Sequence, residues 1–189
     1  MEAVLIDSAD SNDDFRQLES GDFDLIMRQH QQRIFRLLLA IVRDVDAAEQ
    51  LTQECFLRAY KNRSSFRGDA QMSTWLIRIA INLAHDHNRN KRLVFWRGIH
   101  RVEHIESFAA PDVRRSPEQI LIDREKIGQI QLAINRLSHK QRTVFVLRFV
   151  EEMPLEAISK VMDLEIGTVK SHLFRAVESV KKFCRKKKV

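Results

Sequence analysis

Residues 155–175 read LEAISKVMDLEIGTVKSHLFR, and this stretch predicts the architecture of the C-terminal part of the chain. Two short apolar stripes of helical spacing run through it, one from Leu155 to Met162 and one from Ile166 to Phe174, and they are separated at Asp163. Two brief helices joined by a tight turn form a helix-turn-helix, whose second helix enters the major groove of DNA. The alternative is an ordinary helical hairpin, but basic residues gather on the second helix and just after it, as DNA binding requires.

Composition and charge agree with a partner that is a polyanion. Hydrophobic residues make up 44% of the 189 residues, and five Gly with three Pro leave few helix breakers, so the composition favours helices. The net charge is +6 and the isoelectric point is near 9.6. The charge is uneven, because acidic residues crowd residues 1–24 and basic residues crowd residues 166–189.

Other kinds of site are not expected from the sequence. Cys55 and Cys184 have no partner at metal-ligand spacing, and the histidines form no ligand set, so neither a metal nor another cofactor is predicted. No apolar run approaches the ~20 residues of a membrane span, and the acidic N-terminal segment is unlike a signal peptide. We therefore expect a cytoplasmic protein with a buried Cys55 and a surface Cys184.

Apolar periodicity predicts an all-α fold of two small helical domains joined by a flexible linker. In the first domain we expect helices over about 22–43, about 45–62, and from an N-cap at Ser73 to about Lys91. In the second we expect a helix from Ser116-Pro117 to about Arg136, one from Ser138 to near Glu152, and the helix-turn-helix. The predicted segments are an acidic tail at 1–20, a first domain at 21–93, a linker at 94–116, a second domain at 117–183 with the helix-turn-helix at about 155–175, and a basic tail at 184–189.

The second predicted helix carries a stripe of acid and amide side chains. They recur at helical spacing and line one outer face: Asp46, Glu49, Gln50, Gln53 and Glu54. This face is either solvated or a docking site for a basic protein surface, and the residues alone favour neither.

The third predicted helix has the opposite polarity. One of its faces combines an aromatic ring with basic and amide groups: Trp75, Arg78, Asn82, Asp86 and Arg89. Such a surface suits unstacked bases and a phosphate backbone. The neighbouring loop supplies a glycine, hydroxyls and a charge pair that are suited to hold an extruded base: Ser65, Phe66, Arg67, Gly68 and Asp69.

Four motifs, in order and correctly spaced, resemble those of the extracytoplasmic-function (ECF) class of bacterial RNA polymerase sigma factors. They are DAAEQLTQECFLRAY at 46–60, SFRGD at 65–69, TWLIRIAIN at 74–82 and IGTVKSHLFRA at 166–176. This compact type of the sigma-70 family has only the second and fourth conserved regions. An ordered set of motifs is far more specific than a single helix-turn-helix.

The resemblance implies a role for each surface. The stripe on the second helix would dock on the clamp coiled coil of the largest polymerase subunit, with the flap as a further polymerase contact. The 65–69 loop and the third helix would read and melt the −10 element. The last helix would read the −35 element with Thr168, Lys170, Ser171, His172, Phe174 and Arg175. The resemblance also implies control by an anti-sigma factor, and it implies that the protein is not an enzyme.

Three residues depart from the family pattern. Ser159 stands where Ala is common, Asp163 where Gly is common in the turn, and His172 where Arg is common in the reading helix. Asp tolerates a left-handed backbone better than most residues, so we expect the turn to form. His172 bears on the base preference at −35.

Competing functions remain open from the residues. A helix-turn-helix activator that does not bind core polymerase stably is the main alternative. A response-regulator output domain would need βα units upstream, and residues 1–115 show no such alternation. A nuclease would need clustered carboxylates, and Asp86 has no second inward carboxylate beside it.

Overall fold

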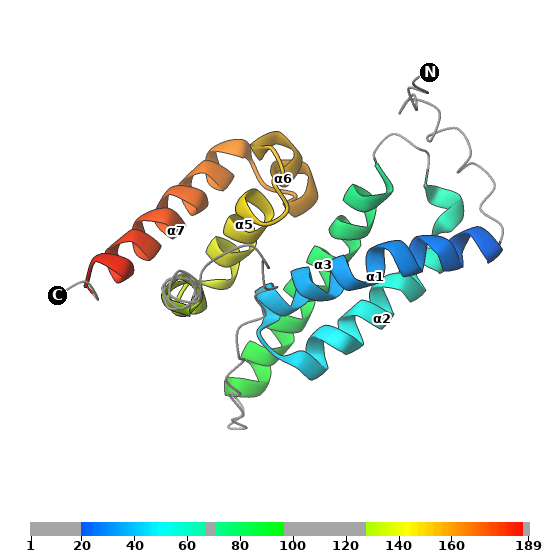
Figure 1. The fold of residues 1–189 in the computed structure, drawn as a ribbon, viewed down its shortest axis with the longest axis horizontal. Coiled ribbons are helices and arrows are strands. Elements are labelled where there is room, and N and C mark those ends of the chain that lie inside the picture. Colours follow the sequence, from blue (N-terminus) through cyan, green and yellow to red (C-terminus); the bar gives the residue numbers. More distant parts are fainter. Residues whose placement is uncertain (1–19, 67–70, 97–127, 187–189) are drawn as a thin grey trace, which may run out of the picture.

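The computed structural model describes residues 20–66, 71–96 and 128–186, and over these ranges it contains helices and turns but no strand (Figure 1). The all-α prediction is confirmed. None of the described helices is both long enough and apolar enough to cross a bilayer. The elements are α1 (Ser20–Val42), α2 (Val45–Lys61), the short 3-10 turn η3 (Arg63–Ser65), α3 (Met72–Trp96), a helical segment at 128–135, α5 (His139–Phe149), α6 (Leu155–Met162) and α7 (Ile166–Lys186).

A tight connection turns α1 back into α2. Arg43 adopts a left-handed backbone with φ 58° directly after α1. Asp44 then caps α2, since its side-chain oxygen accepts a hydrogen bond of 3.0 Å from the Ala47 N–H. The two helices therefore pack as an antiparallel pair, and α3 packs against both.

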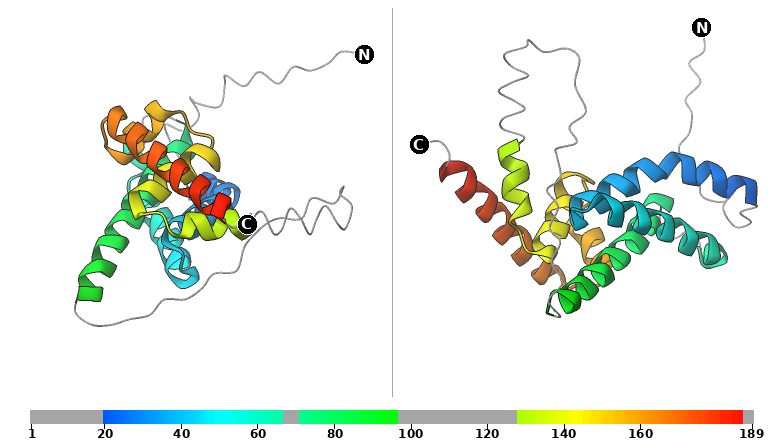
Figure 2. Two further views of the ribbon diagram at one scale, coloured as in Figure 1. Left: turned by 90° about the vertical axis from the view of Figure 1, so that its left-hand side faces the viewer. Right: turned by 90° about the horizontal axis from the view of Figure 1, so that it is seen from below.

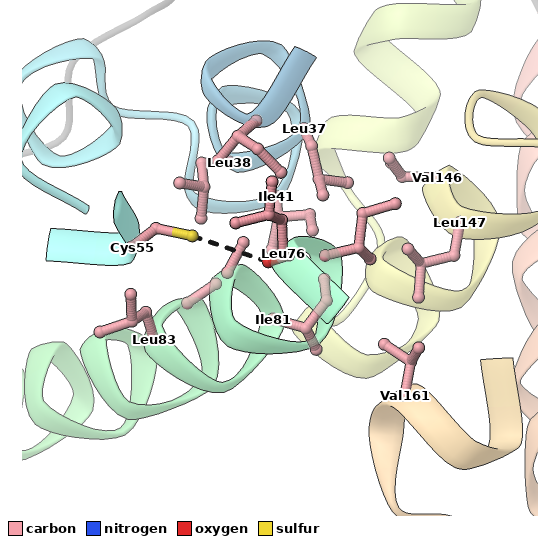
Figure 3. Packing of buried hydrophobic residues seen from close by; sticks show 14 of the residues in the cluster. Leu37, Leu38, Ile41, Cys55, Leu76, Ile81, Leu83, Val146, Leu147 and Val161 are labelled. Carbon is pink, nitrogen blue, oxygen red and sulfur yellow. Dashed lines mark hydrogen bonds between the residues drawn. The ribbon is translucent and has the colours of Figure 1, made fainter. Parts of the chain in front are cut away.

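The core of this three-helix unit is made of residues at helical spacing. Leu38, Cys55 and Leu76 are fully buried, one from each helix. The Cys55 thiol donates to the Leu76 carbonyl at 3.6 Å, and burial raises the pKa of this thiol to about 12 (Figure 3). The prediction of a buried Cys55 is confirmed.

The second unit consists of α5, α6 and α7, with α5 packed on both of the others. Ser138 caps α5 in a capping box with Gln141, as its side chain accepts from the Gln141 N–H and the Gln141 side chain accepts from the Ser138 N–H. The predicted N-cap at Ser138 is therefore confirmed. Ile158 of α6 and Val169 of α7 are fully buried and join the last two helices.

The two units lie directly against each other, which the sequence did not predict. α5 packs on α1, and α6 packs on α3, so that a single apolar core continues from one unit into the other (Figures 1 and 2). Close up, Ile41 and Ile81 of the first unit lie beside Val146, Leu147 and Val161 of the second (Figure 3).

Several predicted boundaries were wrong. α3 begins at Met72, which places Ser73 in its first turn and not at its N-cap. It also continues past Lys91 to Trp96, so residues 94–96 of the predicted linker are helical. α5 ends at Phe149, before Glu152. α7 runs through Lys186 into the predicted basic tail, since Lys and Arg are good helix formers that continue a helix unless a breaker follows. The predicted helix start at 116–117 lies outside the described residues.

Candidate nucleic-acid and protein interfaces

The turn of the helix-turn-helix is built around Asp163. This residue adopts the left-handed conformation with φ 51° and ψ 52°, as expected for a residue that stands where glycine is common. The Ser159 carbonyl accepts from the N–H groups of both Asp163 and Leu164, the latter at 3.1 Å. The Ser159 hydroxyl donates to the Leu164 carbonyl at 2.6 Å. Ser159 and Asp163, which both depart from the family pattern, are therefore joined by a hydrogen bond of this turn, and the turn forms as predicted.

The second helix of this motif presents its polar residues to solvent. The structure places Thr168, Lys170, Ser171, Phe174 and Arg175 on the exposed surface of α7, and His172 is half-buried. Phe174 is 69% exposed, the largest exposed fraction among the exposed large hydrophobic side chains of the described residues. The Ser171 hydroxyl donates to the Gly167 carbonyl at 2.9 Å, and its lone pairs remain able to accept. Burial, followed by the nearby Lys140 and Arg175, lowers the pKa of His172, so that the neutral imidazole is favoured at neutral pH.

The polar face of α3 also lies at the surface. Arg78, Asn82 and Arg89 are exposed along it, and Arg89 forms a 3.6 Å ion pair with Asp86. At the N-terminal end of this face Trp75 is half-buried and packs on Phe66, with ring centroids 5.3 Å apart.

The loop before α3 is described only in part. Phe66 is 7% exposed, so its ring lies in the core below this face, where it supports Trp75. Ser65 lies in η3, and Arg67, Gly68 and Asp69 lie outside the described residues. In the described part of the chain no group of three or more His, Cys, Asp or Glu side chains is arranged to hold a metal ion.

The acid and amide stripe of α2 borders a groove. Asp46, Glu49, Gln50 and Gln53 are exposed, and the half-buried Glu54 accepts from Arg58 at 2.7 Å. Between α1 and α2 lie two adjoining hollows of about 410 and 490 Å³ that share the side chains of Gln31, Thr52 and Gln53. Of the stripe, Glu49 and Gln53 line these hollows, so this part of the stripe forms one wall of a groove.

One end of this groove is apolar. Its lining residues there are Phe23, Met27, Phe56, Leu57 and Tyr60. Leu57 is 46% exposed, and the rings of Phe23 and Tyr60 meet edge to face with centroids 5.2 Å apart. Reasoning from the sequence missed this apolar end, although Leu57 and Tyr60 follow Gln53 by four and seven residues and so share its face.

A buried arginine and a half-buried histidine lie where the two units meet. Arg142 of α5 is 5% exposed, and burial, with the nearby Arg43, lowers the pKa of its guanidinium to about 10. At the start of α5, burial and the surrounding Arg142, His85, His87 and Lys140 lower the pKa of His139 to about 4. Sequence reasoning missed these groups, because nothing in their spacing marks them as buried.

The geometry defines a two-unit helical protein whose second unit carries a helix-turn-helix of the DNA-binding type. Residues 26–94 match the protein family described as "Sigma-70 region 2", and residues 127–180 match the family described as "Sigma-70, region 4". The chain is 34% identical over 181 residues to the RNA polymerase sigma-H factor of Pseudomonas aeruginosa, with 88% of this chain and 89% of that protein covered. It is 33% identical over 178 residues to the ECF RNA polymerase sigma factor SigW of Bacillus subtilis, with 90% and 94% covered.

The chain belongs to the ECF sigma factors of the sigma-70 family. It is therefore a transcription initiation factor that binds core RNA polymerase and recognises the −35 and −10 promoter elements.

Solved structures share the fold. The sigma factor RpoE bound to the anti-sigma factor NepR, from Bartonella quintana, has a TM-score of 0.65 at 20% identity and covers 87% of this chain and 97% of that one. CnrH in complex with the cytosolic domain of CnrY has a TM-score of 0.62 at 16% identity and covers 92% and 94%.

Proposed function

We propose that three surfaces of this sigma factor divide the work of promoter recognition among them. The α1–α2 groove with its acid and amide wall binds core polymerase at the clamp coiled coil of the largest subunit. The α3 face from Trp75 to Arg89, with the 65–69 loop, binds the −10 element. The exposed face of α7 binds the −35 element. The observation that carries this proposal is the separation of an acidic, groove-forming face on α2 from a basic face on α7.

The charges of these surfaces support the assignment. An acidic wall repels DNA and attracts a basic protein surface, whereas the apolar end of the groove offers the buried contact that binding energy requires. On α7, Lys170 and Arg175 are exposed and available to phosphates or base edges. Phosphate contacts set the register of the complex, and base contacts supply the specificity.

At the −10 element we assign a supporting role to Phe66. Its ring is buried against Trp75, so a direct contact with DNA would require it to leave the core. The half-buried Trp75 and the exposed Arg78 and Asn82 are the groups on this face that a displaced strand would meet first.

We further propose that the protein works in the cytoplasm, makes and breaks no bond itself, and is controlled by an anti-sigma factor. The solved structures with this fold, RpoE and CnrH, are complexes, the first with the anti-sigma factor NepR and the second with the cytosolic domain of CnrY. The partly exposed apolar end of the α1–α2 groove is a surface that such a partner would cover.

The test is run-off transcription with purified core polymerase on a promoter library. Initiation that depends on this protein, from sites with −35 and −10 boxes, is the expected result. Gln53→Arg should weaken binding to core polymerase, while Gln29→Arg, at a glutamine of α1 that is also exposed but lies outside the groove, should not. If both variants bind core polymerase as the parent does, the groove is not the polymerase site.

The −35 assignment has its own pair of variants. Arg175→Ala should weaken initiation on promoters that keep the −35 box and should leave the residual initiation from templates with a scrambled −35 box nearly unchanged. Lys61→Ala, at the end of α2, removes an exposed positive charge far from α7 in the chain and serves as the control. If this protein binds DNA but does not change initiation by core polymerase, the result would instead favour the activator alternative.

A further inference from the structure

α7 is longer than a helix-turn-helix requires. It runs without a break from Ile166 to Lys186, and its 21 residues span about 30 Å at a rise of about 1.5 Å per residue (Figure 1). The −35 face, which is the exposed side of residues 168–175, occupies only the first half of this length. The second half of the helix therefore lies beyond the residues assigned to the −35 element.

The inner side of the second half holds it on the second unit. Ala176 is fully buried, and Val177, Val180 and Phe183 are half-buried at helical spacing behind it. The guanidinium carbon of Arg136 lies 4.8 Å from the centroid of the Phe183 ring. These contacts fix the orientation of the second half, and with it the direction in which its outer side points.

The outer side carries three basic residues. Lys181, Lys182 and Arg185 are exposed, and the acid beside them is Glu178. Glu178 pairs with Lys181, with Oε1 and Nζ 3.3 Å apart. Within the described part of the chain, neither Lys182 nor Arg185 forms an ion pair, so their charges are available to an outside anion.

These basic residues continue the −35 face and do not form a separate one. Eleven residues are close to three turns of an α-helix, so side chains eleven positions apart lie on the same face. Each of the three basic residues stands eleven positions after a member of the −35 face, in the pairs Lys170 and Lys181, Ser171 and Lys182, and Phe174 and Arg185. One polar face therefore runs along most of α7.

The spacing along the helix decides what each half of this face can meet. Eleven residues correspond to about 16 Å, whereas the major groove of B-DNA is about 12 Å wide. With the first half among the base edges, the second half passes beyond the edge of the groove, where the sugar–phosphate backbone lies. Lysine and arginine side chains there neutralise phosphates and carry no information about the bases.

We propose that the second half of α7 is a second, sequence-independent DNA contact, in which Lys182 and Arg185 bind phosphates of the backbone that flanks the −35 element. The inference rests on the proposed function, because it needs the first half of α7 to lie in the major groove. Lys181 contributes less, since Glu178 already compensates its charge. The phosphate contact sets the register of the second unit on the promoter, while the first half of the helix selects the sequence.

The test compares two double variants of equal charge. Lys182→Gln with Arg185→Gln removes the proposed contact, and glutamine is a good helix former at these exposed positions, so α7 should stay intact. Arg36→Gln with Lys61→Gln is the control, since both residues are exposed on the first unit and neither lines the α1–α2 groove. Far-UV circular dichroism and the affinity for core polymerase should be the same for the parent and both variants.

The readout is the dissociation constant of each protein, assembled with core polymerase, for a fluorescent promoter fragment between about 50 and about 200 mM salt. Each phosphate contact contributes about 0.9 to the slope of log affinity against log salt concentration. We expect the α7 variant to lower this slope by about 1.8, so that its deficit relative to the parent shrinks by about tenfold over this range. The affinity ratio between the −35 box and a box with one base changed should stay that of the parent.

A slope equal to that of the parent and the control would overturn the phosphate contact. A changed ratio between the two boxes would overturn its sequence independence. Weaker binding to core polymerase with an unchanged salt slope would make this face a protein-binding site instead.

A parent that neither binds core polymerase nor supports initiation would overturn the proposed function. The salt slopes of the free parent and the free α7 variant on the same fragment would then decide separately on the phosphate contact, and equal slopes would overturn that as well.

Discussion

Lowering the pH should destabilise the folded protein through His139. This imidazole is half-buried at the start of α5, where Lys140 and Arg142 of its own helix and His85 and His87 of α3 lie around it. Its ring centroid is 6.2 Å from that of His85. Burial and these basic neighbours lower its pKa to about 4, whereas an exposed histidine has a pKa near 6.5. The folded protein therefore holds this group neutral at a pH where the unfolded chain protonates it.

The sign and size of the effect follow from this difference. Because the folded pKa lies below the unfolded one, the stability is fully present above pH 6.5 and is lost as the pH falls from there toward pH 4. Proton linkage for this one group gives a loss of about 2 kcal/mol in the free energy of unfolding at about pH 5, and of about 3 kcal/mol once the folded form is also protonated.

The assay is urea unfolding followed by far-UV circular dichroism at about pH 7.5 and about pH 5. His139→Gln removes the titrating group and keeps a good helix former, so it should lose about 2 kcal/mol less than the parent over this range. His30 and His172, whose pKa values are lowered mainly by burial, contribute to the pH dependence of both proteins and cancel in the comparison. Equal losses for parent and variant would refute the reasoning.

Three further changes test the local structure. Ser138→Ala removes the capping box of α5 and should lower the urea-unfolding free energy by about 1 kcal/mol, whereas an unchanged value would show that the cap contributes nothing. Ile158→Ala opens a cavity at a fully buried position of α6 and should lower the free energy of unfolding by about 2–5 kcal/mol. It should also weaken −35 DNA binding in a gel-shift assay, and intact binding despite the lost stability would show that DNA binding does not depend on this packing. Asp163→Gly relieves the strain of the left-handed backbone and should raise the free energy of unfolding by up to about 1 kcal/mol, and with it the thermal midpoint. A lower midpoint would contradict the strain argument.

Local features of the fold were predictable, and contacts between the units were not. The helix-turn-helix and the cap at Ser138 follow from apolar spacing and from a single polar side chain before a helix, both of which act over a few residues. The burial of Arg142 depends on carbonyls at the ends of two helices. One of them, the Ile41 carbonyl of α1, lies 101 residues before Arg142 in the chain. No periodicity within α5 encodes that arrangement, because an arginine on a helix is ordinarily expected at the surface.

The candidate site shows the same division. The exposed positions of α7 and the stripe on α2 follow from helical spacing, since their neighbours at the core-facing positions are apolar. The groove beside α2 depends on how α1 crosses it, which places Met27 and Gln31 opposite Phe56 and Gln53. The sequence predicts an end of α3 that is too early, because Val94-Phe95-Trp96 contains no helix breaker and continues the helix.

The unequal environments of the two cysteines give the protein a ready-made attachment point for a reporter dye. The chain has two cysteines, and the one in the first unit is buried with a thiol pKa of about 12, so it holds almost no reactive thiolate at neutral pH. Cys184 lies on the last turns of α7 with part of its surface exposed. A maleimide fluorophore should therefore label the natural sequence at a single position on the proposed −35 helix, and its anisotropy would follow promoter docking without any substitution.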